Sequence, residues 1–420
     1  MTMIVTNQLF SFLSYTGRQL HAFPVRNRLS FQMAADRYSC LVMLSYAIKH
    51  IYVHIPFCDG KCSYCGFYSD IKTDSNAADY LFCLEKEMGI IFGDVPQRDP
   101  ETIYFGGGTP SILNVSQLAA LLEIVHRSVS NRKTKEWTIE ANPGTLPPEK
   151  IRILKDAGVN RVSIGVQSFD DNILKQIGRR HSSADVFATI DLLRNNGIYN
   201  IGIDLIASLP NVDKTMWRLT LEKTIALRPE HVSVYALTLE HGTALERLVA
   251  AGNVSTSGDD SQLKALRFAE QLLNTAGYER YETSNYALPG YACRHNLAYW
   301  RGSDYLGFGP GACSRAALER WTNKADTKTY CEALNRHTTP PREKELLTAQ
   351  EDSIERLMFG FRLAEGVDLG EFDASPELVS KWKAALERMA YDGLVEHRDG
   401  RWFTTMRGRD IADHIAEEML

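Results

Sequence analysis

Three cysteines stand close together in the sequence HIPFCDGKCSYCGFY. Cys58, Cys62 and Cys65 follow a C-x-x-x-C-x-x-C spacing. Three thiolates on one short loop can each hold one iron of a cubane cluster and leave the fourth iron open for a small ligand. A structural zinc site needs a fourth ligand at comparable spacing, and the residue two positions after Cys65 is Phe67. The spacing predicts a [4Fe–4S] cluster, and a zinc site that borrows a distant ligand is the alternative.

Glycine or polar residues recur at the ends of the strands predicted after this loop. They are Gly106–Gly108 in YFGGGTP, Glu140 in IEANPGT, Gln167 in GVQSF, Arg179 and His181 in the later GRRHS, and Asp204 in IDLIASLP. Glycines let the backbone approach a ligand closely, and carboxylate, amide and guanidinium groups bind hydroxyls and carboxylates. Each residue alone could be a cap or an ion-pair partner, Asp204 most of all. Their recurrence at successive strand ends predicts one ligand site.

The segments that must position these residues alternate between strand-like and helix-like patterns. Short β-branched runs lie at residues 51–55, 102–105, 137–140, 161–166, 201–206 and 231–236. Amphipathic stretches lie between them, at residues 115–128, 148–157, 183–196 and 215–227. Six strand–helix repeats with nearly continuous apolar strands predict an α/β fold, with helices covering a parallel sheet that is open or curled into an incomplete barrel. Ligands in such folds bind at the carboxyl ends of the strands.

The segment after the last repeat changes character. A helix is predicted at residues 263–276 and a Gly- and Tyr-rich connection at residues 277–311. Beyond Pro340 and Pro341, residues 351–362 and 379–392 are helix-like, residues 393–405 resemble a short hairpin, and residues 408–420 form a last helix. Helices followed by a hairpin predict a small winged-helix-like module. It has more acidic than basic residues, the opposite of what phosphate contacts need.

Composition narrows the class of protein. The chain has 420 residues, of which 44% are apolar and 24% charged, and a formal net charge of −5. These values are typical of a soluble globular protein and argue against a nucleic-acid partner. No uninterrupted apolar run approaches the ~18 residues of a transmembrane segment. Eight cysteines are too few for a disulfide scaffold, which favours metal ligation in a reducing, cytoplasmic compartment.

The first fifty residues differ from the rest, because they contain several arginines and a single acidic residue, Asp36. An Arg-rich, Ser-containing, acid-poor leader can be an organellar transit peptide. No clean amphipathic period runs through this segment. A start assigned too early, with Met43 as the first residue, is therefore the favoured interpretation, and residues 1–50 are treated as a leader outside the fold.

The motifs HIPFC, FGGGTPS, IEANPGT, RVSIGVQSF, GRRH, YETSNYA and HNLAYW together resemble the coproporphyrinogen III oxidase-like branch of the radical S-adenosylmethionine (SAM) superfamily. The resemblance covers the chain from about residue 51 onward. It implies a partial (β/α)6 barrel at residues 51–311 and a C-terminal, mainly helical, winged-helix-like domain at residues 312–420. It also implies that the open iron of the cluster binds SAM. The implied SAM contacts, some of which would serve a second SAM molecule, are Tyr52, Tyr64, Gly107, Gly108, Thr109, Glu140, Gln167, Arg179 and Asp204.

Two functions from different classes occur in this branch. One is a haem chaperone, which transfers haem to acceptor proteins, and the other is the oxygen-independent coproporphyrinogen III dehydrogenase. The dehydrogenase pattern continues to C-x-x-x-C-x-x-C-x-C, and this chain has Phe67 in place of the extra cysteine. The chaperones carry H-N-x-x-Y-W, present here as His295, Asn296, Leu297, Ala298, Tyr299 and Trp300. The resemblance therefore favours a haem chaperone.

The residue types of this motif suit a haem site. The imidazole of His295 can ligate haem iron, and Tyr299 and Trp300 offer flat surfaces to a porphyrin. The alternative is that His295 supports the pocket, or that the motif packs the mouth of the barrel. Cys313 could also reach a ligand, although an ordinary buried cysteine is favoured. The resemblance further implies a haem-accepting protein and an electron donor as partners, and a homodimer.

Overall fold

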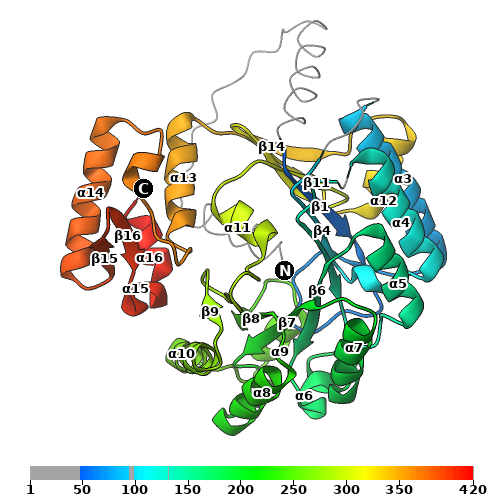
Figure 1. Cartoon of the computed structure of the whole chain (residues 1–420), viewed down its shortest axis with the longest axis horizontal. Coiled ribbons are helices and arrows are strands. Elements are labelled where there is room, and N and C mark those ends of the chain that lie inside the picture. Colours follow the sequence, from blue (N-terminus) through cyan, green and yellow to red (C-terminus); the bar gives the residue numbers. More distant parts are fainter. Residues whose placement is uncertain (1–47, 94–98, 131, 420) are drawn as a thin grey trace, which may run out of the picture.

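A computed structural model of the chain describes residues 48–93, 99–130 and 132–419 (Figure 1). The predicted leader, with Met43 as its proposed start, lies outside the described residues except for residues 48–50. His50 already belongs to the first strand of the sheet. Within these ranges, no helix combines the length and the apolar character that a membrane span requires.

The centre of the fold is a twelve-stranded sheet that contains six consecutive parallel strands. These six are β1 (His50–Ile55), β4 (Thr102–Gly107), β5 (Glu136–Ala141), β6 (Arg161–Gln167), β7 (Asn200–Ala207) and β8 (His231–Ala236). Each strand pairs with the next one in this order. The sheet curves without closing, so the predicted parallel α/β fold with an incomplete barrel is confirmed (Figure 1).

Further strands extend the sheet on both sides. β11 (Tyr305–Phe308) lies parallel to β1, followed by antiparallel β12 (Cys313–Ala316), β13 (Glu319–Asn323) and β14 (Arg342–Leu346). At the other edge, β10 (Asn285–Ala287) and β9 (Glu279–Arg280) follow β8. The Gly- and Tyr-rich connection predicted at residues 277–311 therefore contains strands that the sequence did not reveal, because strands of two to four residues are too short to show a period. The sheet also continues beyond residue 311.

Helices lie between successive strands in the sequence, and most of them cover the outer face of the sheet (Figure 1). They are α3 (Asp74–Phe92), α4 (Val115–Ser128), α5 (Pro148–Ala157), α6 (Asp171–Gln176), α7 (Ser183–Asn195), α8 (Lys214–Leu227), α9 (Ala244–Ala250), α10 (Asp259–Thr275) and α12 (Thr327–Asn335), with the single turn η1 (Pro110–Ile112). Asn114 caps α4 in a reciprocal pair with Gln117. Such a cap satisfies free backbone N–H groups, so α4 begins where the sequence predicts.

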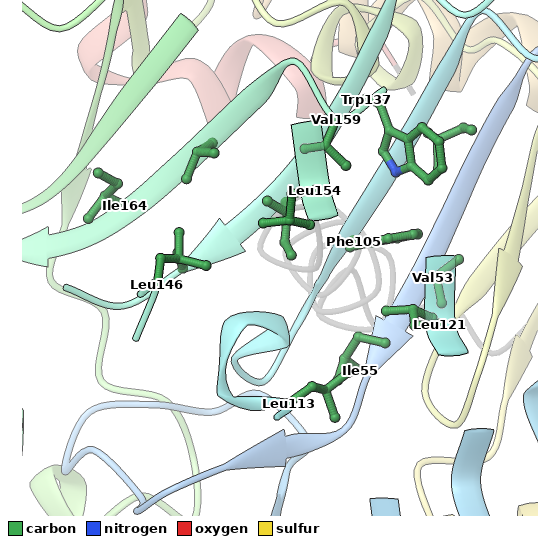
Figure 2. Packing of buried hydrophobic residues seen from close by; sticks show 14 of the residues in the cluster. Val53, Ile55, Phe105, Leu113, Leu121, Trp137, Leu146, Leu154, Val159 and Ile164 are labelled. Carbon is green, nitrogen blue, oxygen red and sulfur yellow. The ribbon is translucent and has the colours of Figure 1, made fainter. Parts of the chain in front are cut away.

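The main core lies between the sheet and these helices (Figure 2). Val53 and Ile55 of β1, Phe105 of β4 and Trp137 of β5 are completely buried together with Leu121 of α4. Burial of one side chain of this size stabilises the fold by about 1.5–3 kcal/mol. Strands covered in this way must be almost continuously apolar, which is why their pattern could be recognised in the sequence.

The C-terminal part of the chain forms a second, smaller core. Its elements are α13 (Ala349–Gly360), η2 (Leu369–Glu371), α14 (Pro376–Tyr391), β15 (Val395–Arg398), β16 (Arg401–Thr404), α15 (Met406–Asp410) and α16 (Ala412–Glu417). Its core surrounds Trp382 and includes Trp300 of α11 (Arg294–Trp300), which comes from outside this domain. The helices and the hairpin agree with the prediction. The predicted last helix is instead two short ones, because the backbone leaves the helical region at Ile411.

Buried ion pairs fix this domain to the sheet. Arg315 of β12 and Arg320 of β13 approach Glu355 of α13 at 3.9 and 3.1 Å. Arg315 also pairs with Asp352 of the same helix. Removal of one partner from such a buried pair costs about 3–5 kcal/mol, because the other charge is left unpaired. These pairs therefore hold the C-terminal domain in one position relative to the barrel.

Candidate functional site

The three cysteines lie on the loop after β1, where they are half-buried and line one large cavity. Cys58 ends the short strand β2 (Phe57–Cys58), which pairs with β3 (Asp70–Ile71). Two other segments hold the loop: Ser63 N donates to Ile177 O (3.0 Å), and Leu245 N donates to Ser63 O (2.7 Å). The loop is therefore held by backbone hydrogen bonds that are independent of any bound cluster.

The sulfur atoms have different polar neighbours. Thr109 Oγ1 lies 3.5 Å from Cys58 Sγ, and Arg179 Nη1 lies 3.8 Å from Cys62 Sγ. Burial raises the pKa of the Cys58 and Cys65 thiols, and the Thr109 contact partly offsets this rise at Cys58. The thiolate is the metal-binding form, so metal binding must release these protons.

The glycine run Gly106–Gly108 ends β4 and is required by close packing against the cysteine loop. Gly108 N donates to Ile55 O (2.8 Å), and Thr109 N donates to Phe57 O (2.7 Å). A Cβ atom on Gly108 would lie 2.4 Å from Phe57 O, and Gly107 has a φ of +108°. Only glycine tolerates both demands. The run thus places the strand end beside the cysteine loop, and Gly107, Gly108 and Thr109 all line the cavity.

Glu140 lies at the end of β5 and faces the glycine run. Its carboxylate accepts hydrogen bonds from Tyr104 OH (2.8 Å) and from Gly107 N (3.2 Å). Both donors belong to β4, the neighbouring strand. The carboxylate is therefore fixed at the cavity wall, where it can accept a hydrogen bond from a ligand.

Arg179 joins several strand ends. Its Nη2 atom donates to Asn142 Oδ1 (2.7 Å) and to the carbonyl of Gly165, while Asn142 Nδ2 donates to Thr109 Oγ1 (3.2 Å). Arg179 Nε is buried and makes no hydrogen bond to any of the described residues, so this donor is available to a ligand. Asn142 is a site residue that sequence reasoning missed, although it follows Glu140 in the IEANPGT motif.

Gln167 ends β6 in a strained backbone conformation. Its φ is +64°, in the left-handed region that side chains other than glycine rarely occupy, and a β-bulge lies between Gly165 and Gln167. Bulges re-aim side chains at strand ends, and such strain is concentrated at functional sites. The side chain of Gln167 lines the cavity beside Arg179. The bulge therefore explains why a strand-end amide faces the ligand site.

Asp204 is buried inside β7 and also lines the cavity. Ser163 Oγ lies 3.2 Å from both of its carboxylate oxygens. Burial raises the pKa of Asp204 to about 6, and the nearby Glu140 carboxylate adds to the rise. A buried carboxylate whose negative charge is not balanced by a nearby basic group, so that its pKa is raised, is a marker of a ligand site. This favours the ligand interpretation of Asp204 over a loop cap.

One cavity of about 1340 Å³ brings these groups together. Its cluster side is lined by Cys58, Cys62, Cys65, Glu140, Arg179 and Asp204. Its domain side is lined by Trp300, Met358, Phe359, Phe361, Arg362 and Arg409, which come from α11 and the C-terminal domain. Sites for one ligand usually measure about 300–1,000 Å³, so this cavity has room for more than one.

The groups on the cluster side fit the two cofactors that the sequence implies. Three thiols on one held loop supply the donor set of a [4Fe–4S] cluster with one open iron. The unpartnered Arg179 Nε can bind a carboxylate, and the carboxylates of half-buried Glu140 and buried Asp204 can accept from amino or hydroxyl groups. SAM carries all of these groups, so its chemistry matches this wall of the cavity.

The HNLAYW motif forms α11, which lies at the opposite end of the parallel strands from the cysteine loop. His295 is 1% exposed; its Nδ1 lies 2.6 Å from Thr102 Oγ1 and its Nε2 lies 3.1 Å from Tyr299 OH. Glu136, at the start of β5, accepts from the backbone N–H groups of Arg294 (2.9 Å) and His295 (3.0 Å). Both ring nitrogens of His295 are therefore engaged in this conformation, and the start of α11 is anchored at the amino ends of β4 and β5.

The structure brings most of the predicted site residues to the cavity and keeps some away from it. Those that line it are Tyr64, Gly107, Gly108, Thr109, Glu140, Gln167, Arg179, Asp204, Trp300 and the three cysteines. Tyr52, His295, Asn296 and Tyr299 are buried in the packing around it. Cys313 is buried as well, with its sulfur 3.0 Å from Thr322 Oγ1. The residues of the C-terminal domain gave no signal in the sequence, because they are distant from every motif.

Comparison with known proteins agrees with this arrangement. The profile of the Radical SAM superfamily matches residues 52–223, and that of the HemN C-terminal domain matches residues 347–411. The proteins named Heme chaperone HemW from Bacillus subtilis and Escherichia coli are 32% and 33% identical to this chain. Both alignments cover 88% of this chain, and they cover 98% and 97% of the relatives. A zebrafish (Danio rerio) relative, named Radical S-adenosyl methionine domain-containing protein 1, mitochondrial, is 32% identical over 77% of this chain and 75% of its own.

A solved structure shares the fold. Coproporphyrinogen III oxidase (HemN) from Escherichia coli, described as a radical SAM enzyme, superposes with a TM-score of 0.76 over 90% of this chain and 92% of its own. Its sequence identity is 22%, so the likeness shows the barrel and the C-terminal domain but not a shared activity. The identity to the heme chaperones over nearly their whole length is decisive, and this chain belongs to the HemW family of radical SAM proteins.

Proposed function

We propose that this protein is a haem chaperone that binds a [4Fe–4S] cluster, SAM and haem, and transfers haem to acceptor proteins. The observation that carries the proposal is the single cavity with two chemically different sides. The cluster side offers thiolates, carboxylates and a guanidinium, and the domain side offers aromatic and thioether groups with arginines. This combination suits one polar cofactor and one large, mostly apolar ligand in the same cavity.

In this proposal Cys58, Cys62 and Cys65 each hold one iron. When bound, the cluster supplies one-electron chemistry and an open iron for SAM. Around it, the SAM-binding residues are Tyr64, Gly107, Gly108, Thr109, Glu140, Gln167, Arg179 and Asp204, with Asn142 holding Arg179 in place. Tyr52 supports this wall indirectly, since it packs against Tyr104, whose hydroxyl donates to Glu140.

In this proposal the HNLAYW motif contributes one residue, Trp300, to the haem site. Its indole lines the cavity, and the guanidinium of Arg362 lies over its ring, 4.5 Å from the centroid. His295, Asn296 and Tyr299 act as positioning residues that dock α11 against β4 and β5. His295→Ala should therefore weaken haem binding through loss of α11 docking, without changing the position of the haem Soret band. A shifted Soret band in that variant would instead make His295 an iron ligand.

The proposal includes partners that follow from the family. They are an electron donor for the cluster, a haem-accepting protein, and a second copy of the chain in a homodimer, all in the cytoplasm. The negative formal charge of −5 argues against nucleic acid as a partner.

The test is anaerobic reconstitution with iron and sulfide, followed by two assays on the same sample. The first follows haem binding by absorption and haem transfer to an apo-haem protein. The second follows coproporphyrinogen III consumption with SAM and a reductant. Haem binding and transfer without turnover supports the chaperone. SAM-dependent formation of protoporphyrinogen would overturn the proposal in favour of a dehydrogenase.

A further inference from the structure

An ion cluster closes the far end of the domain side, where β9 and α10 meet the C-terminal domain. Arg409 Nη2 lies 3.0 Å from Glu270 Oε1, and Arg280 Nε lies 3.7 Å from the same oxygen. The side chains of Arg280, Glu270 and Arg409 are only 10%, 18% and 24% exposed. All three residues line the cavity. Two guanidinium groups therefore share one carboxylate oxygen at a largely buried seam.

The ion cluster of Arg280, Glu270 and Arg409, taken with its charged neighbours, has more basic than acidic groups. Glu282, which is 1% exposed, is a second acidic group near these arginines: burial raises its pKa, and Arg362 and Arg280 oppose that rise. Arg280, Arg362 and Arg409 outnumber Glu270 and Glu282 by one charge, and the Arg267–Asp410 ion pair that lines the same cavity adds no net charge. Burial and repulsion from Arg409 lower the pKa of Arg280. A buried surplus of cationic groups is costly unless an anion joins it.

The walls next to this cluster are apolar and in part flat. Trp300, Phe359 and Phe361 line the same side of the cavity. Met358, directly before Phe359, and Met406, on the same helix as Arg409, line it as well. Aromatic and thioether side chains are the surfaces that bind planar apolar molecules. The domain side thus offers a flat apolar wall that ends in cationic groups.

We propose that Arg280 and Arg409 bind the carboxylates of a planar tetrapyrrole whose ring lies against Trp300 and Phe359. This inference rests on the proposed function, and it names the residues that recognise haem by its two propionates. Arginine binds carboxylates through paired N–H donors, and each of these arginines has donors beyond the one that faces Glu270.

The position of the Arg280–Glu270–Arg409 ion cluster sets the orientation of the tetrapyrrole. Glu270, Arg280 and Arg409 also line a second pocket of about 690 Å³, on the other side of the same seam. They therefore stand between the main cavity and this outer pocket. A ligand with carboxylates at one edge would place that edge at the seam and its apolar edge inward, because charged groups are more costly to bury than the ring.

The experiment compares haem with haem dimethyl ester, which has the same ring and no carboxylate charge. Binding is measured by absorption titration on the cluster-loaded full chain for the wild type, Arg280→Gln, Arg409→Gln and the control Arg398→Gln. Arg398 lines the outer pocket but not the main cavity. We expect each seam variant to bind haem at least ~10-fold more weakly, as for loss of a charged hydrogen bond. The diester should bind wild type and variants alike, and Arg398→Gln should behave as wild type.

The outcomes separate this inference from the proposed function. If the wild type binds no haem, the proposed function fails. If it binds haem but the seam variants bind it equally well, or the wild type binds haem and the diester equally, the assignment of the carboxylate site is overturned. Cluster absorption and thermal unfolding check that each variant is folded. Should the glutamine variants not fold, the haem-against-diester comparison on the wild type decides alone.

Discussion

Replacing Asp204 with asparagine should stabilise the protein without SAM and weaken its binding of SAM. Asp204 is buried, and its pKa rises from 3.8 to about 6. At about 1.4 kcal/mol for each pKa unit, this shift corresponds to about 3 kcal/mol. The ionised carboxylate destabilises the folded protein by roughly this amount at neutral pH. Asparagine is neutral and can still accept a hydrogen bond from Ser163.

The effect of pH has a defined sign. Between about pH 4 and about pH 6, the folded protein keeps the Asp204 proton while the unfolded chain releases it, so the free energy of unfolding falls as the pH rises. Above about pH 6 both states are ionised and this dependence ends. The stabilisation by Asp204→Asn should therefore be about 3 kcal/mol at about pH 7.5 and about half as large at about pH 5.

Urea unfolding of the wild type and the variant, followed by circular dichroism at both pH values, measures this difference. Asp191→Asn, at an exposed position of α7, is the matched control and should change stability by less than about 0.5 kcal/mol. SAM binding by calorimetry should be at least ~10-fold weaker in Asp204→Asn, because an acceptor for the ligand is lost. Equal stability of variant and wild type at pH 7.5, or a gain independent of pH, would refute the reasoning.

Three further perturbations test other parts of the structure. Cys62→Ser should abolish the visible absorption of the reconstituted cluster, whereas Cys83→Ser, on α3, should retain it; full iron content in the first variant would contradict the cluster assignment. Gln167→Gly should raise the free energy of unfolding by about 1 kcal/mol through relief of the positive φ and still bind SAM more weakly, as unfolding and binding titrations would show. Glu355→Ala should lower the free energy of unfolding by about 1–3 kcal/mol, because Arg320 loses its buried partner and keeps only the more exposed Glu345; a loss below about 0.5 kcal/mol in a urea titration would contradict this.

The sequence by itself determined the parallel sheet and the cluster side of the cavity. The strands could be recognised because a parallel sheet buried under helices needs nearly continuous apolar runs. Cys58, Glu140 and Asp204 could be recognised because each lies in or directly after such a run, and the carboxyl ends of parallel strands meet at one edge. For these residues, position along the chain is equivalent to position in the site.

Only the tertiary structure decided the domain side. Trp300, Phe359 and Arg409 lie far apart in the chain, and α11 and the C-terminal domain bring them to one cavity with Arg280 of β9. The placement of His295 was decided in the same way, since its contacts with Thr102 and Tyr299 depend on how α11 packs against β4. Such contacts follow from how elements pack, and packing between distant segments leaves no period or spacing in the sequence, because it depends on shape and charge across the interface rather than on neighbours along the chain.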